Sequence, residues 1–145
     1  MKTLHWVSFS AGLMLMSLLA LPLGYAQMGP GPGRRARMYN PATETTVKGT
    51  VEEVKTISGR RGWWNGIHLM LKAEDKTLDV HLGPESFLKE KGFSFAKGDQ
   101  VEVIGSKVNY QGGEAIIARE VKKDGKTLTL RDAQGIPQWS GRGRR

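Results

Sequence analysis

The residues best suited to chemistry are two histidines within one stretch of alternating apolar and polar residues. His68 precedes a short polar turn and His81 follows it, with Met70 and Asp79 two positions nearer the turn. Imidazole nitrogen and thioether sulfur suit copper better than zinc, magnesium or calcium. These side-chain types predict an open copper site with His68, His81 and Met70 as ligands. Asp79 could orient an imidazole through a hydrogen bond.

A β-hairpin over residues 67–84 is expected to hold these side chains. Leucine, isoleucine and valine alternate with polar residues on both sides of Glu74 and Asp75, the pattern of a half-buried hairpin. A turn centred on these two residues sets His68 opposite His81, and directly opposed side chains have Cβ atoms roughly 4.5–5.5 Å apart. The plainer interpretation of the pair is that two imidazoles pack on a partly exposed face without a metal.

A second candidate set combines cations with aromatic rings. Five residues form this predicted ligand-binding set: Arg60, Arg61, Trp63, Trp64 and Tyr110. The rings could stack on a flat ligand while the arginines meet its charge. The alternative is that the two tryptophans pack in the core or at its rim.

Catalytic motifs are missing from the sequence. It contains no Gly-x-Ser-x-Gly, no His-Glu-x-x-His and no phosphate-binding loop. Of the three histidines, His5 lies in the predicted signal, which leaves two for acid–base work. We therefore expect no catalytic residues and no enzyme.

The chain divides by composition into four parts. Lys2 precedes an apolar run over residues 7–23, and Gly24 and Ala26 are the small residues that signal peptidase requires. Residues 1–26 are thus expected to be a cleaved signal peptide that exports the protein to the periplasm, with a membrane-anchored N-terminus as the alternative. Three further parts follow: a Gly/Pro/Arg-rich linker (27–43), a folded domain (44–132) and an irregular basic tail (133–145).

The net charge of +8 comes from the tails and not from the folded domain. Residues 44–132 hold fifteen Lys and Arg against fourteen Asp and Glu. A nearly neutral body argues against tight binding to nucleic acid, which usually needs a basic patch on the fold. The arginine-rich tails could contact an anionic surface or could serve as solubilising arms.

The strand pattern predicts a mainly β fold. Strands are expected at residues 45–57, in both arms of the hairpin, and at 100–108, 114–121 and 127–130, with a short helix at 84–91. Gly49 predicts a bend in the first strand. Residues 109–113 are expected to form a hairpin loop. This order resembles the OB-fold, a five- to six-stranded Greek-key barrel with one short helix between strands 3 and 4, which binds ligands on its strand 2–3 face.

Several stretches also resemble the magnetosome MamS/MamX-type domain of small exported bacterial proteins. They are GIHLMLK, VHLGPESFL, KGDQVEVIGSKV, IIAREV and LTLRDAQGIPQWSG, within residues 46–141. The resemblance implies a periplasmic or membrane-associated role, linked in some members to iron handling, so iron joins copper as a candidate metal. MamX-type members carry Cys-x-x-Cys-His haem sites. This sequence has no cysteine, so covalent haem is not expected. A looser resemblance is to periplasmic OB-fold stress proteins.

Together these observations predict a non-catalytic exported binding module. Its OB face would bind a small ligand, a metal or a periplasmic or membrane-associated protein partner. One alternative is a soft-metal carrier that uses the histidine pair. Another is single-stranded nucleic-acid binding through the Arg/Trp loop.

Overall fold

The structure, a computed structural model, describes residues 38–59, 62 and 64–141. The predicted signal peptide, most of the predicted linker, and Arg60, Arg61 and Trp63 lie outside these residues. Among the described residues no helix has the length and apolar character to cross a membrane. The elements in chain order are η1 (Pro41–Thr43), β1 (Glu44–Ser58), β2 (Asn65–Ala73), β3 (Lys76–Pro84), α1 (Glu85–Glu90), β4 (Gln100–Tyr110), β5 (Gly113–Lys123) and β6 (Lys126–Thr129).

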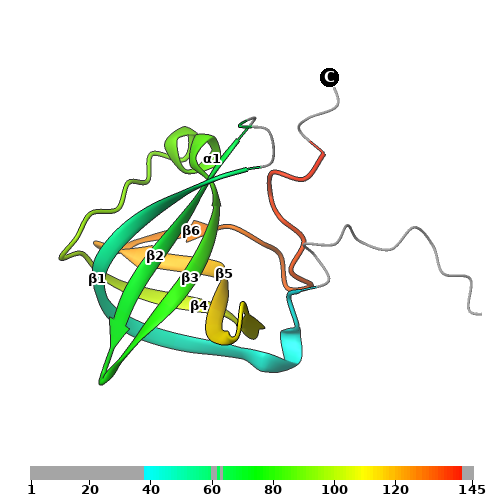
Figure 1. The fold of residues 1–145 in the computed structure, drawn as a ribbon. Coiled ribbons are helices and arrows are strands. Elements are labelled where there is room, and N and C mark those ends of the chain that lie inside the picture. The colour runs from blue at the N-terminus through cyan, green and yellow to red at the C-terminus, as the bar shows by residue number, and fades with distance from the viewer. Residues whose placement is uncertain (1–37, 60–61, 63, 142–145) are drawn as a thin grey trace, which may run out of the picture. The chain divides into compact units, whose positions relative to one another are not determined.

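Five strands close into a small barrel, and a sixth extends it (Figure 1). The antiparallel sheet runs in the order β3-β2-β1-β4-β5-β6, and a parallel pairing of β3 with β5 closes the barrel. The helix α1 lies between β3 and β4 in sequence and follows directly on the end of β3. The prediction of a mainly β, OB-like barrel with one short helix between strands 3 and 4 is therefore confirmed.

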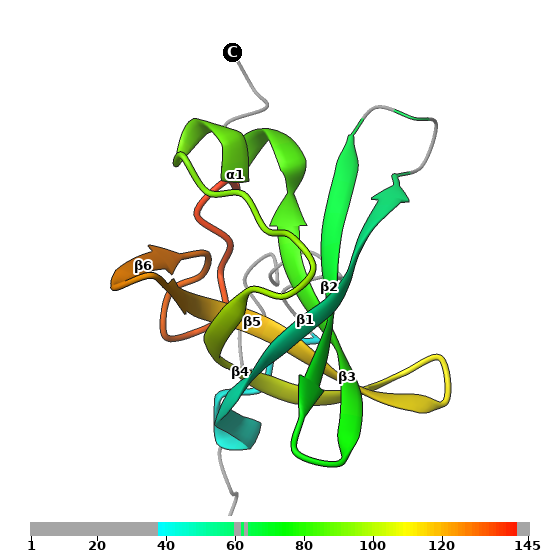
Figure 2. The ribbon, with the colours of Figure 1, turned by 90° about the vertical axis from the view of Figure 1, so that its left-hand side faces the viewer.

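The long first strand bends and serves both halves of the barrel (Figure 2). Its first half, from Glu44, pairs with β4, and its second half, from Thr50, pairs with β2. The register shift of this strand lies between Val51 and Glu53, not at Gly49 where the sequence suggested a bend. Gly49 is required for another reason: a Cβ there would lie 2.3 Å from the Lys72 carbonyl oxygen.

The hairpin of β2 and β3 forms with the predicted register. Leu69 lies opposite Val80, and His68 opposite His81. Because side chains alternate along a strand, the leucine and valine side chains point into the barrel while the imidazoles lie on its outer face. Glu74 has a positive φ of 56°, which closes the two-residue turn between the strands.

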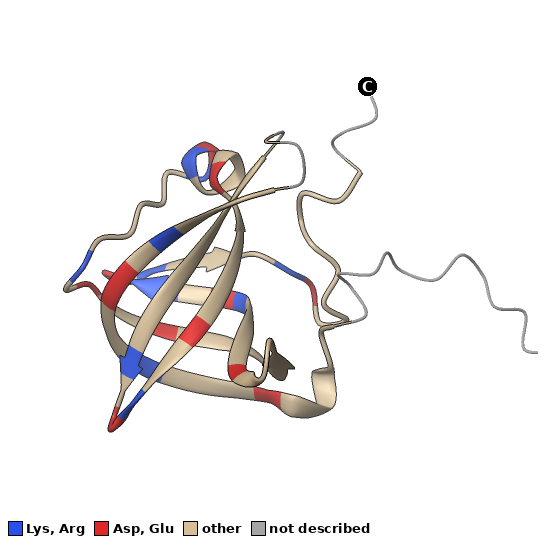
Figure 3. Ribbon diagram, viewed as in Figure 1, with Lys and Arg blue, Asp and Glu red and all other residues tan. Residues whose placement is uncertain are grey.

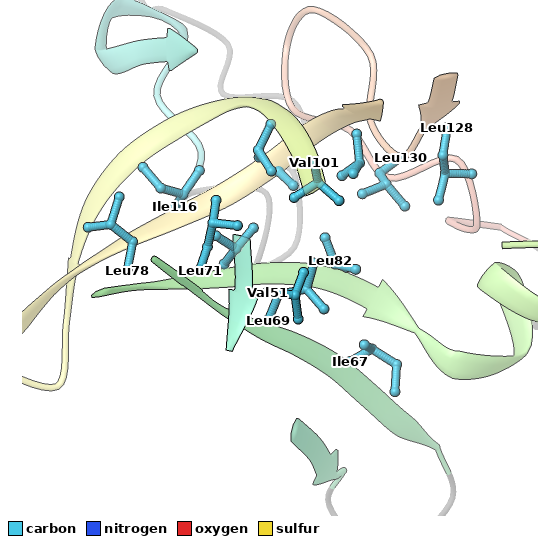
Figure 4. Close-up of a cluster of buried hydrophobic side chains, with 14 of the residues drawn as sticks. Val51, Ile67, Leu69, Leu71, Leu78, Leu82, Val101, Ile116, Leu128 and Leu130 are labelled. Carbon is cyan, nitrogen blue, oxygen red and sulfur yellow. The ribbon is translucent and has the colours of Figure 1, made fainter. Parts of the chain in front are cut away.

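The core is built from the inward residues of all six strands and α1 (Figure 4). Leu69, Leu71 and Val80 of the hairpin have no exposed surface. They meet Ile116 of β5 and Leu130, which follows β6, and these are also fully buried. The outer face of the hairpin is thus held on a rigid apolar base.

The strands β4 and β5 extend further than the sequence suggested. Residues 109–113 were expected to form a loop, yet Tyr110 pairs with Gly113 and only Gln111 and Gly112 form the turn. Both turn residues have positive φ values, 50° and 78°. Such turns match the twist of paired strands, so pairing continues to the tip and carries Tyr110 toward the hairpin.

Segments on either side of the barrel also pack against it. Tyr39, in the stretch predicted as linker, is buried, and its hydroxyl donates a hydrogen bond to the Glu44 carboxylate. Its ring lies against Gly135, where a Cβ would approach to 2.4 Å. Trp139, in the predicted irregular tail, is half-buried against the core, with its ring centroid 5.2 Å from that of Phe87.

Candidate functional site

The two histidines and Asp79 form one cluster on the outer face of the hairpin. The imidazole rings stack with their centroids 3.9 Å apart and their planes 25° from parallel. His68 Nδ1 lies 3.1 Å from Asp79 Oδ1, within hydrogen-bond distance. His81 Nε2 lies 3.5 Å from Asp79 Oδ2, and no hydrogen-bond partner for this buried nitrogen exists among the described residues. The cluster therefore leaves one buried imidazole nitrogen unsatisfied.

Burial keeps both imidazoles neutral. Their side chains are only 16% and 15% exposed, against 30% for Asp79. Burial lowers the pKa of His68, although the Asp79 carboxylate works in the opposite direction. Burial and the neighbouring His68 together lower the pKa of His81 to about 4. At neutral pH both rings therefore have a lone pair, which is the state that a metal ligand needs.

The donor atoms of the cluster lie close enough to share one ion. One nitrogen from each imidazole and one carboxylate oxygen all fall within 4.8 Å of one another. A transition metal needs each donor at about 2.0–2.2 Å, so small ring rotations would have to bring them together. Met70 pairs across the strands with Asp79 and lies on the same face. Asp79, expected only to orient an imidazole, thus offers a ligand atom of its own.

Tyr110 joins this cluster from the β4–β5 hairpin. Its ring meets the His81 ring edge to face, with centroids 4.6 Å apart. Sequence reasoning placed Tyr110 in a different candidate set from the histidines. The structure brings it together with them because β4 and β5 remain paired up to Tyr110 and Gly113.

A pocket of about 270 Å³ adjoins the imidazoles. Two indoles flank it, each packed on a glycine. A Cβ at Gly59 would lie 2.3 Å from Trp64 Cε2, and one at Gly83 would lie 2.5 Å from Trp139 Cη2. The two imidazoles, the phenol of Tyr110 and the guanidinium of Arg131 also line the pocket, together with apolar side chains such as Ile57 and Ile117.

Two of the pocket residues, Trp139 and Arg131, were not predicted as site residues. Both come from the irregular segment after β6, which has no periodic pattern to indicate its direction. Of the predicted ligand set, Trp64 and Tyr110 line the pocket. Arg60, Arg61 and Trp63 lie outside the described residues.

Lys and Arg are interspersed with Asp and Glu along the described chain (Figure 3). Glu102 lies within 3.3 Å of Lys48 and 3.4 Å of Lys122, and Glu114 within 2.9 Å of Lys76. These pairs neutralise basic side chains that a phosphate backbone would otherwise contact.

Comparison with known proteins gives a family for the barrel. A search of curated protein sequences gave no match. The model of the MamS/MamX magnetosome protein family, in contrast, matches residues 43–128. The match begins one residue before β1 and ends within β6, so it covers the closed barrel, both histidines and Asp79. The chain belongs to the MamS/MamX magnetosome protein family.

Proposed function

We propose that this chain is a non-catalytic binding module that holds one transition-metal ion on the outer face of β2 and β3. The observation that carries the proposal is the unsatisfied Nε2 of His81. This nitrogen is buried, is neutral at pH 7, and lies 3.5 Å from a carboxylate oxygen. A buried polar atom without a partner costs about 1–3 kcal/mol, and a metal ion would supply the missing partner.

The donor set favours a divalent ion over Cu(I). Two imidazoles and a carboxylate make a nitrogen and oxygen set, which suits Fe(II), Cu(II) or Zn(II). Cu(I) would need the Met70 sulfur in place of the Asp79 oxygen. Three protein donors leave other coordination positions open, so the ion would be exchangeable. This suits delivery or transient storage better than a structural role.

The proposal includes export to the periplasm. It is supported by the sequence pattern of residues 1–26, in which a basic residue and an apolar run precede small residues. An exported module could receive its ion from, or pass it to, a periplasmic or membrane-associated partner. Fractionation of cells that express the full chain, with N-terminal sequencing of the product, would test export and cleavage after Ala26.

Equilibrium dialysis of the purified mature chain would test metal binding. Anaerobic Fe(II), Cu(II) and Zn(II) are titrated separately, and bound metal is counted against protein. We expect one ion per chain for at least one of them. The variants His68→Ala and His81→Ala should each weaken binding strongly, and so should Asp79→Asn, because it replaces a carboxylate ligand by a neutral amide.

Asp75→Asn is the matched control for Asp79→Asn. Asp75 is an exposed carboxylate in the turn of the same hairpin, so its loss should leave the affinity unchanged. If the double variant His68→Ala/His81→Ala binds as much metal as the unaltered chain, the proposal is wrong and the imidazoles merely pack against each other.

A further inference from the structure

Arg131 is bound to the barrel through only one of its three nitrogens. Its Nη1 donates to the carbonyl oxygens of Leu82, at 2.9 Å, and Ala118. These carbonyls lie one residue past the last pair of the parallel β3–β5 pairing, His81 with Ile117. A guanidinium has five N–H groups, so Nε and Nη2 keep three that have no partner among the described residues.

The charge of Arg131 meets an aromatic ring and not a carboxylate: its guanidinium carbon lies over the Trp139 ring, 5.0 Å from the centroid. No described carboxylate forms an ion pair with it. The neighbouring Asp132 instead accepts hydrogen bonds from the backbone N–H groups of Gln134 and Ile136. Burial lowers the pKa of Arg131 to about 10. Arg131 is partly buried, and a cation withdrawn from water favours a pairing charge, so an anion beside Arg131 would be stabilised.

Arg119 shows what a fully paired arginine looks like in the same barrel. Its Nε and Nη2 lie 2.8 and 2.9 Å from the two carboxylate oxygens of Glu44, and its Nη1 lies 2.6 Å from Glu120. Two carboxylates thus occupy all three nitrogens. Arg131 lacks this arrangement, although it is partly buried like Arg119 and lines the pocket.

The walls of the pocket suit a flat ligand. The Trp139 ring centroid lies 5.0 Å from the Arg131 guanidinium carbon, and Trp64 lines the same cavity. Tyr110 and the imidazoles add further ring surfaces. A cavity of about 270 Å³ is just below the usual range for drug-sized ligands, so the ligand would have on the order of ten non-hydrogen atoms.

We propose that this pocket binds a small planar carboxylate, with the carboxylate on the free N–H groups of Arg131 and its flat body against the indoles. Guanidinium and carboxylate match in geometry and can form two parallel hydrogen bonds. The site does not require the metal ion proposed above, although the imidazoles border both.

Titration of the metal-stripped mature chain with benzoate and with benzamide would test this site. The two compounds have nearly the same shape, but only benzoate is charged. Binding is followed by tryptophan fluorescence and by the NMR signals of the indole N–H groups. We expect benzoate to bind at least tenfold more tightly and to shift the Trp139 signal. If the two bind alike, or neither binds, the proposal is wrong.

Paired arginine variants identify the cation. Arg131→Lys keeps a positive charge and a donor for the Leu82 carbonyl, and should weaken benzoate binding at least fivefold. Arg119→Lys, the matched control, should leave it unchanged. If Arg131→Lys does not fold, Trp139→Phe replaces it: benzoate affinity should fall while metal affinity stays the same. Unchanged benzoate affinity in the folded variant would overturn the assignment. Because these titrations contain no metal, their failure would leave the metal site unaffected.

Discussion

The inner and outer faces of the β2–β3 hairpin are built from the same two strands. They differ in whether their buried atoms all have suitable partners. On the inner face, Leu69 and Val80 have no exposed surface and belong to the apolar core cluster. On the outer face, His81 is almost as well covered, yet it keeps a buried nitrogen without a partner in the described residues. The inner face is optimised for stability. The outer face retains an unsatisfied polar group, which is expected where a protein binds something.

The largest difference between the faces should appear in stability. Leu69→Ala should lower the free energy of unfolding by about 2–5 kcal/mol, because it leaves a cavity in a closed apolar core. Lys72→Ala, at an exposed position of the same strand, should change it by less than about 0.5 kcal/mol. Urea unfolding of the mature chain measures both. Similar losses in the two variants would mean that the inner face is not the main source of stability.

The next effect should be a dependence of stability on pH that comes from the outer face. The pKa of His81 is lowered to about 4 in the fold, from about 6.5 in the unfolded chain. Between these values the unfolded chain binds more protons, so stability should fall as the pH drops from about 6.5 toward 4. The charged or titratable groups that affect His81 are His68, Asp79 and Arg131.

The variant His81→Gln should flatten this dependence, because glutamine does not titrate. Urea unfolding at several pH values between 4 and 7 provides the measurement. An equally steep dependence in His81→Gln would assign the effect to other groups, above all His68, whose pKa burial also lowers.

A smaller effect on stability is expected from a substitution at the point where the pocket wall meets the hairpin. Gly83→Ala would place a Cβ 2.5 Å from the Trp139 ring, so the indole must shift. We expect a stability loss of about 1 kcal/mol, at the low end for overpacking, because Trp139 lies on an irregular segment that can move. Tryptophan fluorescence should change as well. Gly113→Ala, whose Cβ would meet nothing closer than 3.8 Å, should change neither.

The smallest effect on the affinity for divalent ions should come from Met70→Leu. Leucine has a similar volume, so stability should change by less than about 1.5 kcal/mol. If Asp79 and not Met70 is the third ligand, the affinity for divalent ions should change less than twofold. Dialysis against Cu(I) provides the contrast: a large loss of Cu(I) affinity in this variant would favour the sulfur-containing ligand set.

The hairpin and its histidine pair could be predicted because their information is local. Alternation with a period of two, together with one short turn, leaves a single register that buries the apolar residues. His68 and His81 follow from that register. The same logic identified the helix at Glu85–Glu90, where Phe87 and Leu88 face inward between a proline and a glycine.

The pocket could not be predicted, because its parts meet only through tertiary packing. Arg131 and Trp139 lie after the last strand in a segment without periodicity, and nothing local indicates that it returns to β3. Tyr110 was assigned to a loop because the whole stretch 109–113 was predicted as the hairpin loop, whereas only Gln111 and Gly112 form the turn. The ability of Asp79 to act as a metal ligand also depends on the rotamers of both imidazoles. The spacing of these residues in the sequence does not determine those rotamers.

The parallel pairing of β3 with β5 has a consequence for the motion of the barrel. Only three residue pairs close it, 79–81 with 115–117, and Asp79 and His81 belong both to this seam and to the binding face. A closure this short is where transient opening should begin, so its amides should exchange with solvent before those of β1 and β2. An ion held between His68 and His81, or an anion on Arg131, would bind only the closed form. Occupancy would then slow exchange along the seam, and the barrel would open more readily once its ligand has left.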